Sequence, residues 1–453
     1  MRHGIKRAAR RAAVWAIVTW VGIGPWPARL DDPRAFTDEI WFRDTRDRLD
    51  ATPLSLSHGP FSAGAAEVDL IGPTPVNLAG HPGQMGQPYV GVATPCSARA
   101  LTIARGDTVA TVVGADLLLI DEPLARAVAT RSGVNRSELF FTATHTHTGP
   151  GGWGAHPLER LVAGTFNPDE ADHLADRIAE AIVQSRRLVK PAELAFVSVP
   201  CPGLQINRIE PGRPTGDMLS AWIVRRRVGS GPGRVVATLA VFGAHATIAP
   251  TDPPRLDGDY PGAFATHLAG RVDAGIVLFA AGTVGDSAPA RPRGIGPRRA
   301  AATYGAGLAE ALADVFASAR FEADTELINL PLTVALASPR LPMGLASLRF
   351  SPLATWWVGP RRTHLHLLRL GPACLVGFPG DVASHLAGQL RAPISVVATS
   401  FDGDYKGYLV SRDTFLRRPC YETRWMSFFG PDFGEMLVEL AQRGLDRVAV
   451  GQR

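Results

Sequence analysis

A pair of histidines one residue apart, His145 and His147, stands where an apolar stretch gives way to glycine and proline. The stretch 138–144 predicts a strand, and side chains two residues apart on a strand share a face. Both imidazoles are therefore expected to point into one pocket at the end of the strand. Imidazole is the commonest metal ligand in proteins, and a zinc site needs several such groups to converge. The pair predicts part of a metal site, with a polar strand end as the bland alternative.

A third histidine and a carboxylate stand in comparable positions. His245 follows the apolar stretch 235–243, which predicts another strand. Asp381 follows a Gly-Phe-Pro-Gly turn, and a carboxylate oxygen binds zinc at about 2.0–2.2 Å. Each residue has a structural alternative, because a lone histidine after a strand usually packs in the core and an aspartate in this setting can cap a helix.

The stretch from His145 to Gly152 resembles the signature of the neutral ceramidases, zinc amidases that cleave the N-acyl bond of ceramide to a sphingoid base and a fatty acid. Similar segments follow in the same order over 63–431. The resemblance implies a zinc cofactor held by four side chains, namely His145, His245, Asp381 and Tyr408. Asp381 stands where the family has a glutamate, which is longer by one methylene.

The resemblance also implies roles for residues around the zinc ion. His147, Arg208 and Tyr421 are expected to stabilise the oxyanion or carry the proton to the leaving amine while zinc-bound water attacks the amide carbonyl. Contacts with the substrate are expected from Gly151, Gly152, Asp259 and Ser287. Capping of a helix that begins around Pro261 is the alternative for Asp259, and a tight turn alone would explain the glycines.

One segment departs from the family pattern of Gly-Asp-x-Ser-Pro. Here alanine, Ala288, occupies the serine position, and Ser287 stands one residue early. Zinc-bound water does not need that hydroxyl, but ceramide specificity could depend on it. Two other functions therefore stay open: a zinc hydrolase of the same scaffold that acts on a non-ceramide amide or ester, and a catalytically inert, exported lipid-binding relative.

Composition sets the broad class. The 453 residues are 46% hydrophobic and 20% charged, as in globular proteins with a large core. The net charge of +5 is a mild excess, and no aromatic-interleaved basic stripe accompanies it, so nucleic acid is not an expected partner. The expected partner is a lipid substrate, and association with an anionic membrane surface stays open. The four cysteines are widely spaced and could form disulfides or stay free.

The N-terminus resembles an export signal. A basic segment precedes an apolar run over 12–24, which is shorter than the about 20 residues of a membrane-spanning helix. Residues 1–30 are therefore interpreted as a signal peptide or an uncleaved N-terminal anchor. We expect an exported protein, whether periplasmic, secreted or anchored outside the cytoplasmic membrane.

The rest of the chain predicts an α/β fold. Residues 31–60 are expected to form a linker, and 61–453 a single large hydrolase domain with mixed β-sheets and flanking helices. The family resemblance implies that the chain lacks the C-terminal β-sandwich of longer relatives. Strands are predicted at 98–105, 108–118, 138–144, 194–199, 235–243, 275–281, 363–370 and 373–378, and helices at 122–131, 168–187 and 304–319.

Overall fold

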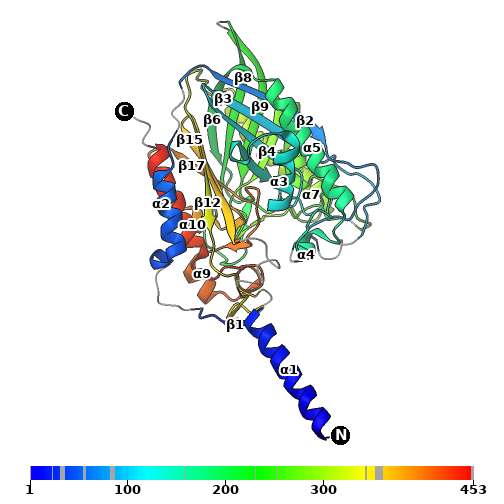
Figure 1. The fold of residues 1–453 in the computed structure, drawn as a ribbon. Coiled ribbons are helices and arrows are strands. Elements are labelled where there is room, and N and C mark those ends of the chain that lie inside the picture. The colour runs from blue at the N-terminus through cyan, green and yellow to red at the C-terminus, as the bar shows by residue number, and fades with distance from the viewer. Residues whose placement is uncertain are drawn as a thin grey trace.

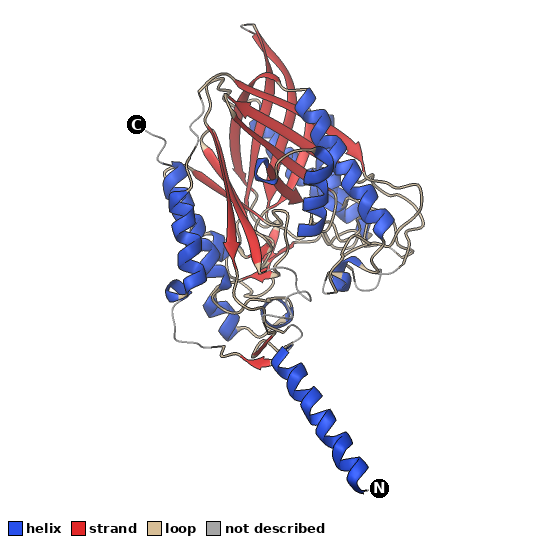
Figure 2. Cartoon of the chain, viewed as in Figure 1, coloured by secondary structure: helices blue, strands red, loops and turns tan. Residues whose placement is uncertain are grey.

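The computed structural model describes residues 2–22, 24–30, 36–54, 58–81, 87–157, 159–229, 231–250, 252–341, 344–351 and 361–449. Within these residues a large and a small β-sheet pack on each other, and helices cover their outer faces (Figures 1 and 2). Buried apolar clusters fill each interface between these layers. The predicted α/β class with mixed sheets is confirmed.

The large sheet has eight strands in the order β10-β9-β8-β6-β2-β3-β4-β5. The pairs β4–β5 and β9–β10 are parallel, and the other neighbours are antiparallel. Apolar residues on its inner face meet the small sheet. The strands are β2 (Phe61–Asp69), β3 (Ser97–Arg105), β4 (Thr108–Ala115), β5 (Leu139–Ala143), β6 (Lys190–Pro200), β8 (Met218–Val228), β9 (Gly231–Phe242) and β10 (Ile276–Ala281).

The small sheet has four strands in the order β12-β14-β15-β17. These are β12 (Leu327–Ala335), β14 (Arg362–Leu370), β15 (Ala373–Gly377) and β17 (Ser395–Thr399). Helices α2 (Ile40–Ala51) and α10 (Phe433–Ala449) cover its outer face. On the large sheet, α3 (Glu122–Ser132) and α5 (Pro168–Arg187) cover the part around β3 to β5, and α6 (Asp259–Arg271) and α7 (Pro297–Phe316) cover the part around β8 to β10.

Helix α5 shows why local sequence rules succeed for some elements. The Asn167 side chain accepts hydrogen bonds from the backbone N–H groups of Asp169 and Glu170, and Pro168 occupies the first turn. Acidic residues begin the helix and arginines end it, as the helix dipole favours. The observed bounds match the predicted 168–187. Helix α7, which lacks a side-chain cap, begins seven residues before the predicted 304.

The predicted linker contains a helix. Within 31–60, residues 31–35 and 55–57 lie outside the described residues, but α2 spans Ile40–Ala51. Its side chains Phe42 and Leu49 are 1% and 0% exposed and join the core beside the small sheet. The many charged residues of α2 favour a linker when the sequence is read alone. Two apolar residues seven apart nevertheless suffice to dock one face of the helix against the core.

Short pairings at one end of the sheets bring distant loops together. Strands β16 (Asp381–Val382) and β18 (Tyr408–Leu409) pair in parallel, with Asp381 opposite Tyr408. Strands β7 (Gln205–Asn207) and β11 (Ser287–Pro289) pair antiparallel. Gly285 allows the two pairings to touch, because a Cβ on it would lie 2.4 Å from the carbonyl oxygen of Asp381.

Helix α1 (Arg2–Gly22) projects away from the sheets in Figure 1. Its described apolar side chains, including Trp15 and Trp20, are exposed. None of the described helices is both long and apolar enough to cross a membrane. All four cysteines are free thiols, so the alternative of disulfides is not what the structure shows.

The close approach at Gly285 gives a stability prediction. Gly285→Ala should lower the melting temperature, because its Cβ overlaps the backbone of Asp381 and both loops must shift. A loss of about 1–3 kcal/mol is expected by thermal or denaturant unfolding. Gly307→Ala is the matched control, since a Cβ there meets nothing within 4 Å and the site is an exposed position of α7. That control should stabilise by about 0.4–1 kcal/mol, and equal effects of both changes would contradict the prediction.

Candidate metal centre

Three histidines form one cluster, and their ligand atoms all lie within 4.8 Å of one another. His145 and His245 are buried, at 4% and 1% exposure, and His147 is half-buried. The Nε2 atoms of His145 and His147 are 3.2 Å apart, and the ring centroids of His145 and His245 are 4.5 Å apart. The cluster could hold a metal ion.

A backbone reversal, and not strand alternation, brings the first two histidines together. Strand β5 ends at Ala143, and His145 has a φ of 59°, in the left-handed region that residues with a side chain rarely adopt. The two rings lie together as predicted. The expected reason, that they share a face of an extended strand, is wrong. Beyond the turn, the N–H of His147 donates to the carbonyl of Ala246 (3.2 Å), which joins the loop after β5 to the loop after β9.

Asp381 and Tyr408 complete the group, as the family resemblance predicts for their positions. The Oδ1 atom of Asp381 lies 3.5 Å from Nε2 of His145 and 3.4 Å from Nε2 of His245. The Tyr408 hydroxyl is 3.3 Å from Nε2 of His245. Asp381 lies in β16 and donates its N–H to Gly407, while the short helix α8 (Ser384–Ala387) begins only after an N-cap at Ala383. The alternative of a helix-capping aspartate is thereby excluded.

The hydrogen bonds around the cluster leave lone pairs facing one another. Nδ1 of His145 lies 2.7 Å from the carbonyl oxygen of Leu118, and Nδ1 of His245 lies 3.2 Å from that of Ser287. Because a carbonyl only accepts, each ring carries its proton on Nδ1, and each Nε2 presents a lone pair. The buried Oδ1 of Asp381 has no hydrogen-bond partner. Nε2 of His245 also accepts a hydrogen bond from Nη2 of Arg208 at 3.3 Å. Acceptors that converge in this way fit a cation.

The spacing of these atoms is compatible with a bound metal ion. A tetrahedral ion with bonds of about 2.0–2.2 Å sets its ligand atoms about 3.3–3.6 Å apart. Three distances in this group, two from Oδ1 of Asp381 to the histidines and one from the Tyr408 hydroxyl to His245, are 3.3–3.5 Å and agree with that geometry. The three-histidine cluster that includes His147 is a second way of holding a metal ion. The ligand set is therefore still a prediction.

Burial keeps the histidines neutral. Loss of solvent lowers the pKa of His145 to about 3, against a smaller opposing effect of its hydrogen bond to Leu118. Burial likewise lowers the pKa values of His147 and His245 well below the usual range, and the nearby Arg208 adds to this. Burial raises the pKa of Asp381 to about 7, although Arg208 and the Tyr405 hydroxyl oppose the shift. Neutral imidazoles are the form that binds metals.

The residues predicted to act in catalysis surround this group. Nη2 of Arg208 donates to the Tyr408 hydroxyl at 2.8 Å, and its Nε forms an ion pair with Glu422 at 3.2 Å. Tyr421 begins a π-helical turn, η4 (Tyr421–Trp425), with its ring 6.0 Å from that of Tyr408, and it is 49% exposed. Tyr421 thus lies on the solvent side of the centre. The roles of Arg208, Tyr421 and His147 stay predictions.

The predicted substrate contacts are placed less directly. The N–H groups of Gly151 and Gly152 donate to the carbonyls of Asn77 and Ala163 at 2.7 Å, so neither is a free donor for an oxyanion. The idea that these N–H groups assist the reaction therefore fails for a structural reason. Ser287 is buried; its hydroxyl donates to Gln205 (3.1 Å), while its carbonyl faces His245.

Asp259 supports the loop after His245 and does not reach into the cluster. Its Oδ2 accepts the N–H groups of Ile248 and Ala249, both at 2.8 Å, and its Oδ1 accepts that of Tyr260. Asp259 has a φ of 53° and is itself the first residue of α6, two residues before the expected start. With both carboxylate oxygens taken up by backbone donors, it is placed to position the loop and not to contact a substrate.

Two residues near the centre were not predicted from the sequence. The Tyr405 hydroxyl donates to Oδ2 of Asp381 at 3.0 Å. His81 packs its ring 5.3 Å from that of His147, and its buried Nε2 has no partner. Tyr405 stands three residues before Tyr408 in a loop. The sequence alone therefore does not show that its hydroxyl contacts Asp381. His81 follows Gly80, whose missing side chain leaves room for His147.

Comparison with solved structures defines the fold. The chain matches neutral ceramidase from Pseudomonas aeruginosa with a TM-score of 0.69 and 17% sequence identity, covering 87% of this chain and 74% of that one. It matches a structure described as ceramidase complexed with C2 with a TM-score of 0.68 and 16% identity, covering 87% and 75%. The chain has a ceramidase-like α/β fold.

Comparison of sequences finds likeness to neutral ceramidases in part of the chain. Residues 61–211 match the model of the neutral/alkaline non-lysosomal ceramidase family, N-terminal. A segment of 193 residues is 29% identical to neutral ceramidase from Mycobacterium tuberculosis, covering 38% of this chain and 30% of that protein. Neutral ceramidase A from Dictyostelium discoideum is 27% identical over 139 residues, covering 29% and 19%. The sequence likeness to the neutral/alkaline ceramidase family is thus carried by residues 61–211. The chain's matches span less than a third of these relatives' lengths.

Two substitutions distinguish the alternative ligand sets. If zinc is held by His145, His245, Asp381 and Tyr408, Asp381→Asn should weaken zinc affinity at least tenfold, because a charged oxygen becomes a neutral amide. His147→Ala should then keep the metal and lose turnover. We expect this result, since the unpartnered Oδ1 of Asp381 faces two ligands. Zinc content by mass spectrometry and chelator competition measure it, and the opposite pattern would establish the three-histidine set.

Asp381 also predicts how pH affects the metal. Its pKa of about 7 means that the carboxyl group of the metal-free protein carries a proton below pH 7, and zinc must displace that proton. Apparent zinc affinity should fall by up to about tenfold per pH unit below 7. His145, with a pKa of about 3, adds no proton until much lower pH. Chelator competition between pH 8 and 5.5 tests this, with Asp381→Asn as control, and a flat profile would contradict it.

Proposed function

We propose that the protein is a zinc-dependent amidohydrolase that cleaves the N-acyl bond of ceramide or a related N-acyl lipid. The proposal rests on a buried site in which the Nε2 lone pairs of His145 and His245 face Oδ1 of Asp381, an atom without a hydrogen-bond partner. The match of residues 61–211 to the ceramidase family supports a lipid substrate. The products would be a sphingoid base, or another amine, and a fatty acid.

The residues around the centre suit amide hydrolysis. A zinc ion, when bound, would supply the Lewis acidity that activates water at neutral pH. His147, neutral and half-buried, can take a proton from that water and pass it to the leaving nitrogen. The guanidinium of Arg208 and the hydroxyl of Tyr421 can stabilise the charge that develops on the carbonyl oxygen.

A groove beside Arg208 offers room for part of a substrate. Its volume is about 680 Å³. Prolines and the 54% exposed Ile206 supply apolar surface, and Arg208 and Arg213 supply positive charge. A fatty acyl chain needs apolar contact, and a carboxylate product can bind a guanidinium bidentately.

A second candidate is hydrolysis of a non-ceramide amide or ester on the same scaffold. The observation that favours it is Ala288 at the family's serine position, together with the Ser287 hydroxyl, which is turned to Gln205. No side-chain hydroxyl at 287 or 288 therefore faces the centre. The inert lipid-binding alternative predicts no turnover of any substrate.

A substrate panel tests the function directly. Zinc-loaded protein, metal-stripped protein and His245→Ala should be assayed on long-chain ceramide, short-chain ceramide, a simple N-acyl amine and a carboxylic ester. We expect zinc-dependent release of fatty acid from ceramide, and at least 10³-fold loss in the other two preparations, because both lack the activating ion. Full activity of the metal-free protein would refute the proposal. Faster turnover of the amine or ester would favour the second candidate.

Ser287 gives a finer test of specificity. Ser287→Ala should reduce turnover by less than about tenfold, because the group that faces His245 is the backbone carbonyl and survives the change. Were the hydroxyl to act in catalysis, its loss would cost about 10²-fold or more, as for other catalytic hydrogen-bond donors. Zinc content is measured alongside. A large loss with zinc retained would assign the hydroxyl a role in the reaction.

We also propose that the protein is exported. The basic residues followed by an apolar run in α1 support this. Cell fractionation with an α1 deletion as control tests it, and wild-type protein confined to the cytoplasm would contradict it.

A further inference from the structure

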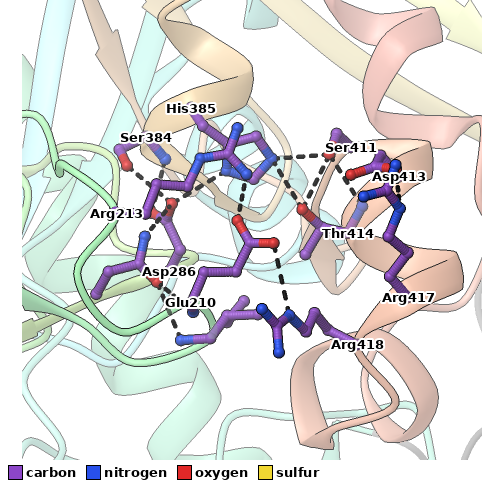
Figure 3. A network of polar contacts seen from close by, with 12 residues as sticks. Glu210, Arg213, Asp286, Ser384, His385, Ser411, Asp413, Thr414, Arg417 and Arg418 are labelled. Atoms are coloured by element: carbon purple, nitrogen blue, oxygen red, sulfur yellow. Dashed lines mark hydrogen bonds and ion pairs between the residues drawn. The ribbon is translucent and has the colours of Figure 1, made fainter.

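A network of buried polar side chains lies beside the metal centre and takes no part in the chemistry described above (Figure 3). Its members Asp286, His385 and Ser411 come from three separate segments. Asp286 and Ser411 are 1% and 7% exposed, and the His385 side chain is 7% exposed. Charged and polar groups this deeply buried are destabilising unless they bond one another, so the arrangement calls for an explanation.

The contacts run in one line from carboxylate to hydroxyl. Oδ2 of Asp286 lies 3.1 Å from Nδ1 of His385, and Nε2 of His385 lies 2.9 Å from Oγ of Ser411. Asp286 also accepts the N–H of Ser384 on Oδ1 (2.7 Å) and its hydroxyl on Oδ2 (2.8 Å). The Nδ2 group of Asn207 donates to the same Oδ2 atom at 3.3 Å.

This order of residues is that of a serine hydrolase, but Ser411 is not placed as a nucleophile. Its Oγ accepts the N–H of Thr414 at 3.2 Å and thereby caps α9 (Arg412–Arg417). Its hydroxyl also donates to Thr414. A nucleophilic hydroxyl must be free to reach a substrate. The network therefore serves the neighbouring centre and not a reaction of its own.

Each member is linked to a group of the metal centre, Asp286 by hydrogen bonds and the other two by closeness along the chain. Asp286 holds Asn207 through its carboxylate and the N–H of Arg208 through its carbonyl (2.9 Å). Ser384 and His385 follow Asp381 on one continuous segment. Ser411 follows Tyr408 in the same way. Figure 3 shows Asp286 and Ser411 reaching His385 from opposite sides, with Glu210 and Arg213 beside the network.

We propose that Asp286, His385 and Ser411 form a positioning unit that sets the spacing of Arg208, Asp381 and Tyr408. The inference rests on the proposed zinc function. β16 and β18 are only two residues long, so their backbone pairing alone cannot fix the distance from Asp381 to Tyr408. His385 joins the segments that follow both strands. Loss of this link would let the Tyr408 hydroxyl move away from Nε2 of His245. The Arg208 guanidinium could likewise move away from the Tyr408 hydroxyl.

Graded variants of His385 test the unit. The amide nitrogen of asparagine can replace Nδ1 and keep the bond to Asp286, while that of glutamine can replace Nε2 and keep the bond to Ser411. His385→Leu removes both. We expect zinc affinity to fall at least tenfold in His385→Leu, with a lower kcat and a small change in KM, and intermediate losses in His385→Asn and His385→Gln. Chelator competition gives the affinity independently of turnover.

Ser185→Ala is the matched control for a lost buried hydrogen bond. Its hydroxyl bonds Thr102 at 2.7 Å between α5 and the large sheet, and its loss should lower the melting temperature with zinc affinity unchanged. If His385→Leu and the milder His385 variants behave like this control, the proposal is overturned. Should His385→Leu fail to fold, Ser411→Ala and His385→Asn carry the same comparison.

The outcomes separate this proposal from the proposed function. Wild-type protein that binds zinc but cleaves no N-acyl substrate would refute the function, while a tenfold affinity loss in the His385 variants would still uphold the positioning unit. Wild-type protein that cleaves ceramide with variants of unchanged zinc affinity and kcat would refute the unit alone. A wild type that takes up no zinc would refute both.

Discussion

The buried carboxylate of Asp381 is the group on which the centre depends. Its Oδ1 has no hydrogen donor and faces two imidazole lone pairs at 3.4 and 3.5 Å. Burial disfavours a charged oxygen in that position and raises the pKa of Asp381 to about 7, against the opposing effects of Arg208 and the Tyr405 hydroxyl. A divalent cation removes the conflict because it accepts all three lone pairs at once. The cluster could thus hold a metal ion.

The fold meets this demand with loops and not with regular strands. The groups come from the ends of β5 and β9 and from two two-residue strands, so long-range backbone contacts must hold them. His147 donates its N–H to Ala246, and Gly285 donates to the carbonyl of Val382. Glycine at 285 lets two backbones approach at a distance that any side chain would forbid. Ordered packing of the two sheets supplies the rigid base from which these loops project.

The sequence predicted elements whose signals are local. The hairpin of β3 and β4 turns at Gly106-Asp107, and α5 carries its own cap, proline and end charges. Family resemblance then brought His145, His245, Asp381 and Tyr408 to one expected site, and the structure places them together. The sequence could not reveal the left-handed turn at His145 or the contact of Tyr405 with Asp381, because both depend on residues far away in the chain. Helix α2 was not predicted for a similar reason: the role of its apolar side chains depends on the small sheet against which they pack.

The balance of charge around the centre suggests which state of a reaction it favours. Arg208 lies against the Tyr408 hydroxyl and is paired with Glu422, while Asp381 supplies the other negative charge. With a divalent cation bound, positive charge exceeds negative charge by one unit in a largely dehydrated space. An anion is then the natural complement, whether a tyrosinate, the oxyanion of an amide under attack or a carboxylate product. In the proposed amide hydrolysis, a neutral substrate would gain least from this field and the developing oxyanion would gain most, which is the difference that lowers a barrier.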